Sequence, residues 1–367
     1  MREKTLITIH KIDLGKQMSE QDKADISSVK KKVLIGMSGG VDSTVSTLLL
    51  KEEGYEVEGV YMKLHSKPGY HEIHQTRAQK AADFAGVKLH ILDLQETFKE
   101  KVVDPFIQTY QKGETPNPCA LCNRNLKFGE MLKFADEVGA EFLATGHYIK
   151  SDGKNLLQAE DDTKDQSYFL FYIQKEILPR LIFPLGTRHK TDIKKYAAQI
   201  EGLESFASQA ESSEICFVET TYTDVLKKFV QVDQPGEVLD AQGNVVGEHK
   251  GYMHYTIGKR KGFTVHGAHD PHFVTKILPE TNQIVVGLKE ELECFDVELR
   301  DINMFDDRVS FDTTVKLRYR TTAVPCRVEV AGDTARLKLL EPVLGVAKGQ
   351  AAVFYDDNKL IGGGWIA

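Results

Sequence analysis

One stretch near the start of the chain constrains the fold more than any other. Residues 33–36 form a short apolar run typical of a buried strand, and the Ser-Gly-Gly of residues 38–40 interrupts it. Apolar residues then recur at helical spacing from Ser43, which is expected to cap this helix through its hydroxyl, to Lys51, and Gly54 stands where a helix-ending glycine would. A strand, a glycine loop and a helix in this order direct backbone N–H groups and the positive end of the helix dipole at one point. This point is expected to bind an anion.

Apolar strand-like runs and helical patterns alternate from this stretch to about residue 150. We expect strands at residues 57–62, 87–92 and 141–145 and helices at residues 72–85 and 125–138. Such alternation predicts a parallel sheet with helices on both faces. Ligands of these sheets bind beyond the carboxyl ends of the strands. Because Met62 and Gly146 follow such ends, we expect them near the anion-binding loop.

The character of the sequence changes further along the chain. Residues 151–218 are polar and then helical, and a helix is expected at residues 192–200 with Thr191 as its cap. After residue 219, short β-rich runs separated by Gly, Asn and Asp indicate a small β-containing domain. From about residue 290, regular short runs predict an antiparallel barrel or sandwich. Its expected strands are residues 315–319, 326–330, 335–340, 351–355 and 360–366.

These changes divide the chain into four parts. Residues 1–30 are expected to form a loosely ordered extension, in which residues 5–9 have the composition of a short strand. A nucleotide-binding domain is expected at residues 31–218, a small central domain at residues 219–289 and a β-barrel domain at residues 290–367.

Composition restricts the class of protein and its compartment. The chain of 367 residues is 41% hydrophobic and 28% charged, as is ordinary for a globular protein, and it has no apolar run long enough to span a membrane. Its five cysteines are odd in number and do not suggest a disulfide framework, so a reducing cytoplasm is expected. A net charge of −7 still permits local basic patches that bind nucleic acid.

After the glycine loop, the most specific motif is a pair of cysteines in the run Pro-Asn-Pro-Cys-Ala-Leu-Cys-Asn at residues 116–123. Its prolines are expected to hold the segment extended before a helix. Thiols just before a helix N-terminus have lowered pKa values because the dipole favours the thiolate. Cys119 and Cys122 are therefore expected to serve sulfur chemistry or metal binding, whereas Cys216 is ambiguous by itself. The two cysteines expected to be small buried residues of the β-rich part are Cys294 and Cys326.

The glycine loop narrows the expected anion to a phosphate of ATP. The loop lacks the Gly-Lys-Ser/Thr ending of a P-loop and does not fit G-x-G-x-x-G. Residues 38–43 instead resemble Ser-Gly-Gly-x-Asp-Ser, the pyrophosphate loop of the ATP-pyrophosphatases, which cleave ATP between the α and β phosphates. The two glycines let the backbone approach phosphate oxygens, and the hydroxyls of Ser38 and Ser43 add donors. Asp42 is expected to hold Mg²⁺ or to fix the loop.

Further motifs extend the resemblance over residues 31–367. They lie at residues 36–43, 59–63, 115–123, 144–148, 164–170, 214–217, 235–236, 258–262 and 318–320. In this order they resemble the tRNA-uridine 2-sulfurtransferases, the tRNA-specific 2-thiouridylases of the MnmA/TrmU type in the PP-loop superfamily. The resemblance implies a doubly wound α/β parallel sheet of the adenine-nucleotide alpha hydrolase type, a small β-containing central domain and a C-terminal antiparallel β-barrel.

The resemblance also implies a reaction, its cofactors and its partners. The wobble uridine of a tRNA is flipped into the site, its C2 oxygen is adenylated by ATP with Mg²⁺, pyrophosphate is released, and sulfur then replaces AMP. A sulfur-donor protein or sulfide is the second implied partner. The implied ATP-binding residues are Gly36, Met37, Ser38, Gly39, Gly40, Val41, Asp42, Ser43, Met62 and Gly146. The implied tRNA-binding residues are Asn117, Pro118 and Cys119, which border the target base, together with Lys164, Asp165, Gln166, Arg318 and Tyr319.

The cysteines depart from the best-known pattern of the family, in which many members carry Asp where this chain has Cys119. The resemblance makes Cys216 the carrier of a persulfide and Cys122 its partner thiol. Three cysteines can also hold a [4Fe–4S] cluster and leave one iron open for hydrosulfide. We favour this cluster on Cys119, Cys122 and Cys216, with persulfide and disulfide chemistry as the rival. Structural Zn²⁺ is disfavoured because no fourth ligand is close in sequence, although His147 could approach in space.

Clusters of basic residues are suited to bind the phosphates of a polyanionic substrate. A single cluster of this kind is, by itself, typical of an ordinary solvent-exposed surface. The clusters lie at residues 188–195, 227–228 and 259–261. Another PP-loop tRNA thiolase or an adenylating synthetase is the alternative enzyme, but the paired cysteines fit sulfur better than nitrogen. An RNA-binding protein that senses ATP would not need the three cysteines.

Overall fold

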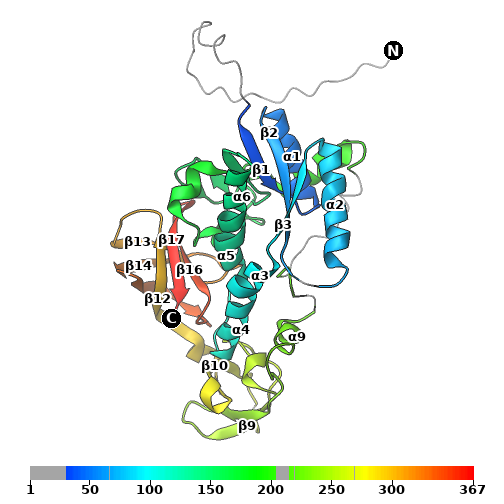
Figure 1. The fold of residues 1–367 in the computed structure, drawn as a ribbon. Coiled ribbons are helices and arrows are strands. Elements are labelled where there is room, and N and C mark those ends of the chain that lie inside the picture. The colour runs from blue at the N-terminus through cyan, green and yellow to red at the C-terminus, as the bar shows by residue number, and fades with distance from the viewer. Residues whose placement is uncertain (1–29, 66, 204–214, 219, 268) are drawn as a thin grey trace.

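A computed structural model describes residues 30–65, 67–203, 215–218, 220–267 and 269–367. Figure 1 shows three parts: an α/β part that carries the first strands, a small sheet near β9 and β10, and a barrel that holds the C-terminus. The expected extension at residues 1–30, with its strand at residues 5–9, falls almost wholly outside the described residues.

The α/β part is built on a five-stranded parallel sheet with the order β3-β2-β1-β4-β7. Its strands are β1 (Lys32–Gly36), β2 (Glu56–Lys63), β3 (Leu89–Asp93), β4 (Phe142–Ala144) and β7 (Leu181–Ile182). The parallel sheet confirms the predicted fold class. The strands expected at residues 57–62, 87–92 and 141–145 are present with ends shifted by one to two residues.

Strand β1 explains why helices cover both faces of this sheet. Val33 and Ile35 pack with Val45 and Leu49 of α1 in one hydrophobic cluster. Leu34 points to the opposite face and belongs to a second cluster. Because successive side chains of a strand alternate between faces, a strand buried on both sides must be apolar throughout.

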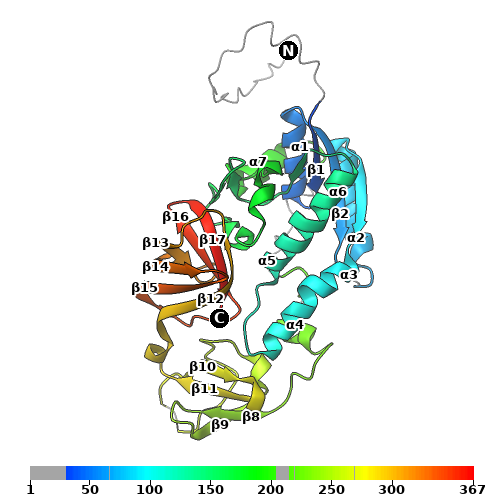
Figure 2. The same cartoon turned by 60° about the vertical axis from the view of Figure 1, so that its left-hand side comes forward.

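Two long helices, α3–η1–α4 and α5–η2–α6, each contain a π-helical segment in the middle. The helices of the α/β part and its continuation are α1 (Val41–Glu52), α2 (Tyr70–Ala85), α3 (Gln95–Phe98), η1 (Lys99–Val103), α4 (Asp104–Gln111), α5 (Pro118–Cys122), η2 (Asn123–Glu130), α6 (Met131–Glu137), η3 (Ser167–Leu170), η4 (Lys175–Arg180), α7 (Lys190–Gln199) and α9 (Tyr222–Leu226). The α3–η1–α4 helix, for which the sequence analysis has no expectation, runs from the α/β part toward the central sheet (Figure 2).

Two predicted helix caps are wrong. Helix α1 begins at Val41 with Gly40 as its cap residue, so Ser43 lies inside the first turn and its hydroxyl bonds back to the Gly40 carbonyl. Helix α7 begins at Lys190 after His189, so Thr191 is already helical. The polar residue nearest the apolar pattern was taken as the cap in both cases, whereas the cap residues lie three and two residues earlier, at Gly40 and His189.

The central part is a four-stranded sheet with the order β10-β11-β8-β9. Its elements are β8 (Gly236–Leu239), β9 (Val245–His249), η5 (Tyr252–His254), β10 (Phe273–Leu278), η6 (Pro279–Thr281), β11 (Gln283–Gly287) and η7 (Lys289–Leu292). Helix α4 is joined to this part because the Tyr252 hydroxyl donates to the Gln111 carbonyl at 2.8 Å.

The C-terminal part is a closed antiparallel barrel, which resolves the choice between barrel and sandwich. Its strands are β12 (Glu293–Met304), β13 (Ser310–Lys316), β14 (Val324–Ala331), β15 (Thr334–Leu344), β16 (Ala351–Asp356) and β17 (Lys359–Ile366). They follow the order β12-β15-β14-β13-β16-β17, and pairing of β12 with β17 closes the ring. The strand expected at residues 315–319 only overlaps the end of β13, and β12 was not anticipated.

A short hairpin of β5 (Lys150–Ser151) and β6 (Leu156–Leu157) joins the α/β part to the barrel, because Leu156 pairs with Leu360 of β17. Among the described residues, no helix combines the length and apolar character needed to cross a bilayer.

Candidate active site

The glycine loop follows β1 and leads directly into α1, as the sequence predicts. Gly39 has a φ of +77°, and a Cβ on it would lie 2.7 Å from the backbone nitrogen of Ala78 in α2. Both the left-handed backbone and the close approach of α2 therefore require glycine. The hydroxyls of Ser43 and Thr44 turn back to the Gly40 carbonyl at 3.1 and 2.9 Å. These bonds fix the first turn of α1.

The carboxylate of Asp42 in this loop is held by a lysine far away in the sequence. The Lys190 ammonium donates to both carboxylate oxygens, at 2.6 and 2.7 Å, and the Tyr148 hydroxyl donates to one of them at 2.9 Å. Lys190 is 6% exposed. Its backbone N–H donates to Asp161 at 2.9 Å, which fixes the start of α7. A buried ammonium therefore lies directly beside the expected phosphate position.

The end of β4 connects this loop to the cysteine-bearing helix. A Cβ on Gly146 would lie 3.3 Å from Asp42 and from the backbone nitrogen of Ser43, so the two chain segments are packed against each other. On the other side, Lys127 of η2 lies 3.2 Å from His147 Nε2. Lysine only donates, so Nε2 accepts and Nδ1–H donates to the Thr145 hydroxyl at 2.7 Å.

Burial and the neighbouring Lys127 ammonium hold the pKa of His147 well below its usual value. The imidazole is therefore neutral and serves as an acceptor at neutral pH.

Cys119 and Cys122 lie inside a helix rather than before one. Helix α5 begins at Pro118, and the Asn117 side chain caps it by accepting from the Ala120 N–H at 3.3 Å. Pro118 takes the first helical position, where its missing N–H has no cost, so the prediction of an extended segment ends at Asn117. The helix expected to begin near residue 125 is the continuation of α5 through η2 and α6.

The predicted lowering of the two thiol pKa values is also wrong. Burial raises the pKa of Cys119, and it raises that of Cys122 to about 11. The Lys127 ammonium acts in the opposite direction on both thiols but does not outweigh the loss of solvation. The dipole of a short helix is weaker than this desolvation, and the sequence pattern contained no measure of burial.

Cys216 lies within electrostatic range of the same pair. Desolvation, followed by the charges of Cys122 and Cys119, raises its pKa to about 12, and Lys127 again lowers it. The Cys216 side chain is nevertheless exposed, whereas Cys122 is buried. Access for a sulfur donor depends on exposed area, and by that measure Cys216 is the open member of the three. Residues 212–214, which precede it in its motif, lie outside the described residues.

The chemistry of the side chains favours an iron–sulfur cluster at this site, whereas their arrangement in the structure does not. Three thiols gathered around one ammonium match the thiolate ligands that such clusters use. In the part of the chain that the structure describes, however, no three His, Cys, Asp or Glu side chains are arranged to hold a metal ion. Cluster binding would require a rearrangement of the three thiols.

Several predicted tRNA-binding residues have structural contacts. Asp165 is 5% exposed and accepts from the Ala159 N–H at 3.0 Å and the Ser167 hydroxyl at 2.7 Å. Gln166 accepts from the Tyr148 N–H at 2.9 Å and therefore supports the residue that bonds to Asp42. Lys164, between Asp161 and Asp165, is half-buried.

The barrel residues of this set lie closer to the cysteines. Arg318 donates to the carbonyls of Ile257 and Gly345 at 3.2 and 2.7 Å, and so joins the central part to the barrel. The Tyr319 ring packs on Phe169 with ring centroids 4.4 Å apart. Burial, then the charge of Asp165 and finally that of Cys119 raise the pKa of Tyr319, so Cys119 lies within electrostatic range of this ring.

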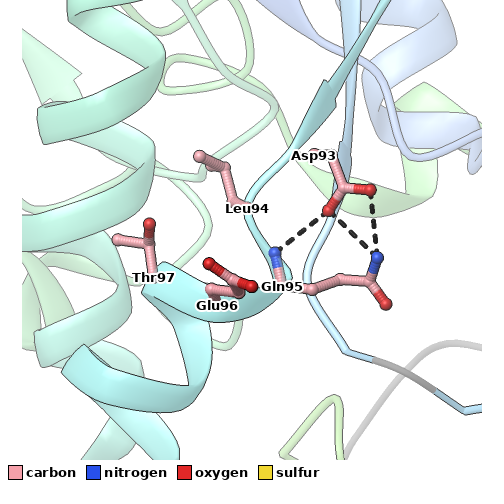
Figure 3. Close-up of a pocket in the computed structure, with 5 residues that line it drawn as sticks. All are labelled: Asp93, Leu94, Gln95, Glu96 and Thr97. Atoms are coloured by element: carbon pink, nitrogen blue, oxygen red, sulfur yellow. Dashed lines mark hydrogen bonds between the residues drawn. The ribbon is translucent and has the colours of Figure 1, made fainter.

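A hollow at the carboxyl end of β3 is lined by Asp93, Leu94, Gln95, Glu96 and Thr97 (Figure 3). Asp93 is bonded to the Gln95 side-chain amide at 3.0 Å. Two carboxylates in this lining disfavour phosphate, so this hollow is not the candidate nucleotide site.

Several lysines of the three basic clusters are already engaged in ion pairs or hydrogen bonds within the protein. Lys195 pairs with Asp192 at 3.3 Å, Lys227 pairs with Asp233 at 2.7 Å, and Lys259 donates to the His254 carbonyl at 2.6 Å. Lys190 was predicted as part of a tRNA-binding cluster, but its ammonium is turned into the loop.

Sequence reasoning missed two functional candidates, Lys127 and Tyr148, because neither belongs to a recognisable charge cluster. Lys127 follows the second cysteine by about one turn of a π-helix, and this spacing was the available signal for it.

Comparisons with known proteins agree with this architecture. Family models match in chain order: a tRNA methyl transferase HUP domain at residues 31–220, a tRNA methyl transferase PRC-barrel domain at residues 223–288 and an aminomethyltransferase β-barrel domain at residues 297–366. Among solved structures, a 4-thiouridine synthetase bound to RNA and ATP is 22% identical, with a TM-score of only 0.33, over 51% of this chain and 45% of that one. This likeness is too weak to support a functional conclusion.

Full-length relatives are much more similar. The tRNA-specific 2-thiouridylase MnmA of Sulfurimonas denitrificans is 70% identical over 92% of this chain and 99% of its own length. That of Nitratiruptor is 55% identical over 92% of this chain and 100% of its own. Identity at this level over nearly the whole chain shows that it belongs to the family of MnmA tRNA-specific 2-thiouridylases.

Proposed function

We propose that this chain uses ATP to replace the C2 oxygen of the wobble uridine of tRNA by sulfur. The observation that carries this proposal is the turn at residues 145–147, which packs on the pyrophosphate loop through Gly146 and contacts Lys127 of the cysteine-bearing helix through His147. An activating nucleotide and the sulfur-handling thiols would thereby act on one atom of the substrate. Membership of a tRNA sulfurtransferase family supports the same reaction.

In the first step, the uridine C2 oxygen attacks the α-phosphorus of ATP. The bond to the oxygen that bridges the α and β phosphorus atoms breaks, and pyrophosphate leaves with the electron pair. Residues 38–43 and the N-terminus of α1 hold the pyrophosphate through backbone N–H groups, and Met62 and Gly146 border the adenosine. The target base must first leave its stack to reach this site.

Asp42 and Lys190 supply the charges for this step. A carboxylate is a suitable oxygen ligand for Mg²⁺, which would offset the charge of the phosphates when bound with ATP. Lys190 already lies 2.6 Å from Asp42 and is then free to turn its ammonium to the phosphates.

In the second step, sulfur attacks C2, and AMP leaves with the former C2 oxygen. In the persulfide route, the terminal sulfur of a Cys216 persulfide attacks C2, and the Cys122 thiolate then attacks Cys216 Sγ. The S–S bond of the persulfide breaks, the 2-thiouridine is released, and a Cys122–Cys216 disulfide remains for an external thiol to reduce. The exposure of Cys216 supports its loading by a sulfur-donor protein.

We favour instead a [4Fe–4S] cluster held by Cys119, Cys122 and Cys216, which would bind inorganic sulfide and present it to the activated base. The support is chemical: this chain has Cys119 where many members of the family carry Asp, so that it supplies three thiols to one site. Asn117 and Pro118 would border the base, and Tyr319 would contact the tRNA beside Cys119.

The remaining assignments follow the same scheme. We propose residues 31–218, 219–289 and 290–367 as the nucleotide-binding, central and barrel domains, and the cytoplasm as the compartment, because tRNA and free thiols are both found there.

The test is anaerobic purification with iron and sulfide analysis, followed by thiolation of tRNA with ATP and sulfide. The variants are Cys119→Ala, Cys122→Ala and Cys216→Ala, and Cys294→Ser serves as the control because that thiol belongs to the barrel. About four irons per chain, lost together with activity in the three variants but not in the control, would support the cluster. Activity of iron-free protein would refute it in favour of the persulfide, and absence of tRNA-dependent pyrophosphate release would refute the proposed function.

A further inference from the structure

The segment at residues 112–117 leads from α4 directly into the cysteine-bearing helix. Helix α4 ends at Gln111, and α5 begins at Pro118, one residue before Cys119. No regular secondary structure holds the segment between them. The position of Cys119 and Cys122 therefore depends on what fixes these six residues.

The barrel fixes the backbone of this segment. The Gln350 side-chain amide donates to the carbonyls of Thr115 and Pro116 at 3.1 and 2.9 Å. In return, the Thr115 N–H donates to the Lys348 carbonyl at 2.8 Å. Gly349 between them has a φ of +83°, and a Cβ there would lie 3.0 Å from Glu114 and Thr115. The turn before β16 is thus shaped to receive the segment.

An ion pair adds a second attachment one residue earlier. Arg300 of β12 donates to both carboxylate oxygens of Glu114, at 3.2 and 2.7 Å. The Glu114 side chain is 13% exposed and that of Arg300 is 41% exposed, so this bidentate ion pair is partly shielded from solvent. A bidentate ion pair between arginine and a carboxylate fixes the relative orientation of the two side chains as well as their distance.

A third contact joins the barrel to the other wall of the cysteine site. The Tyr168 hydroxyl donates to the Ala351 carbonyl at 3.0 Å, immediately after Gln350. Tyr168 and Phe169 are in ring contact, and Phe169 accepts from Asn123, the residue after Cys122. One end of the barrel therefore touches the chain both before and after the two cysteines.

We propose that Arg300 and Gln350 are positioning residues for sulfur transfer: they hold residues 114–116 so that Cys119 and Cys122 face the activated base. The barrel then completes the sulfur-transfer site in addition to any contact it makes with tRNA. This inference rests on the proposed two-step reaction, because it assigns the barrel to the second step and leaves the first to the pyrophosphate loop.

The test separates the two steps in the full-length protein. Arg300→Ala and Gln350→Ala are assayed for tRNA-dependent pyrophosphate release and for 2-thiouridine formed. Arg308→Ala is the matched control, because Arg308 forms barrel ion pairs with Asp306 and Asp356 at 2.8 and 3.1 Å. We expect both variants to form 2-thiouridine about tenfold to a hundredfold more slowly, with pyrophosphate release and the control within about twofold of the unaltered protein.

Two further measurements guard against a general loss of structure. Arg300→Glu should be impaired, and Arg300→Glu combined with Glu114→Arg should recover 2-thiouridine formation, since the pair is restored with reversed charges. Alkylation of Cys119, followed by mass spectrometry, should change in rate in Gln350→Ala but not in Arg308→Ala. An equal loss of both steps, or no loss of either, would overturn the proposal. Absence of pyrophosphate release in the unaltered protein would instead count against the proposed function.

Discussion

Replacement of Lys190 by Met is the sharpest test of the nucleotide site. The substitution keeps an unbranched chain of similar length but removes the ammonium that bonds to both oxygens of Asp42. In the protein without ATP, the side-chain bond that Asp42 keeps among the described residues is the one from Tyr148. Because Asp42 is about one-third exposed, water can replace part of the lost interaction. We therefore expect a loss of about 1–2 kcal/mol in the free energy of unfolding, less than the 3–5 kcal/mol of a fully buried pair.

The effect on the reaction is expected to be larger. A hydrogen bond to a charged group contributes about 1.5–3 kcal/mol, which corresponds to about a 10- to 150-fold change at 1.4 kcal/mol per factor of ten. If Lys190 binds the phosphates, kcat/KM for ATP in tRNA-dependent pyrophosphate release falls by that factor. The matched control is Lys195→Met on the same helix, whose side chain is 73% exposed and pairs with Asp192. A Lys190→Met protein that keeps kcat/KM within twofold of the Lys195→Met protein would refute the assignment.

Three further outcomes follow from the site. Gly39→Ala should abolish ATP binding in equilibrium dialysis and lower the urea midpoint, because a Cβ at a φ of +77° would meet the α2 backbone at 2.7 Å; Gly54→Ala is the control, with a φ of +91° and open space around it. In metal-free protein, alkylation of Cys122 should accelerate about tenfold per pH unit up to about pH 11, where its raised pKa lies, and a plateau near pH 8.5 would contradict this value. His147 has a lowered pKa, so the unfolded chain binds more protons below pH 6.5; stability should fall as the pH drops through that range, and His147→Gln should reduce this slope in urea titrations.

Local patterns in the sequence were sufficient to predict the α/β fold. Strand β1 is apolar on both faces, and a loop with two glycines follows it, so its burial and its ligand-binding end can both be inferred without coordinates. The alternation of strands and helices then restricts the topology to a parallel sheet. The α3–η1–α4 helix was missed, although Phe98, Phe106 and Tyr110 on it are buried in one cluster. Its apolar side packs in one cluster with Leu126 of η2, Leu226 of α9 and Met253 of the central part, and the last two partners are too distant in sequence for local reasoning.

The site shows the same division between local and distant contacts. The resemblance identified the loop and the three cysteines from short motifs, but the partner of Asp42 lies 148 residues away and was assigned to a solvated basic cluster. The pKa direction of Cys119 and Cys122 was wrong for a related reason. A helix dipole can be inferred from the chain, whereas the burial that outweighs it arises from other elements packed around the thiols.

The raised thiol pKa values determine what the second step requires. Burial raises the pKa of Cys122 to about 11, so its neutral thiol predominates at pH 7. Lys127 lowers the pKa of all three thiols but not enough to reverse the effect of burial. An additional positive charge in the site would lower these pKa values and favour the thiolates. Iron bound to the three thiolates would supply that charge permanently, whereas the persulfide route needs it to arrive with the substrate or the donor, and for this reason the iron content of active protein distinguishes the two.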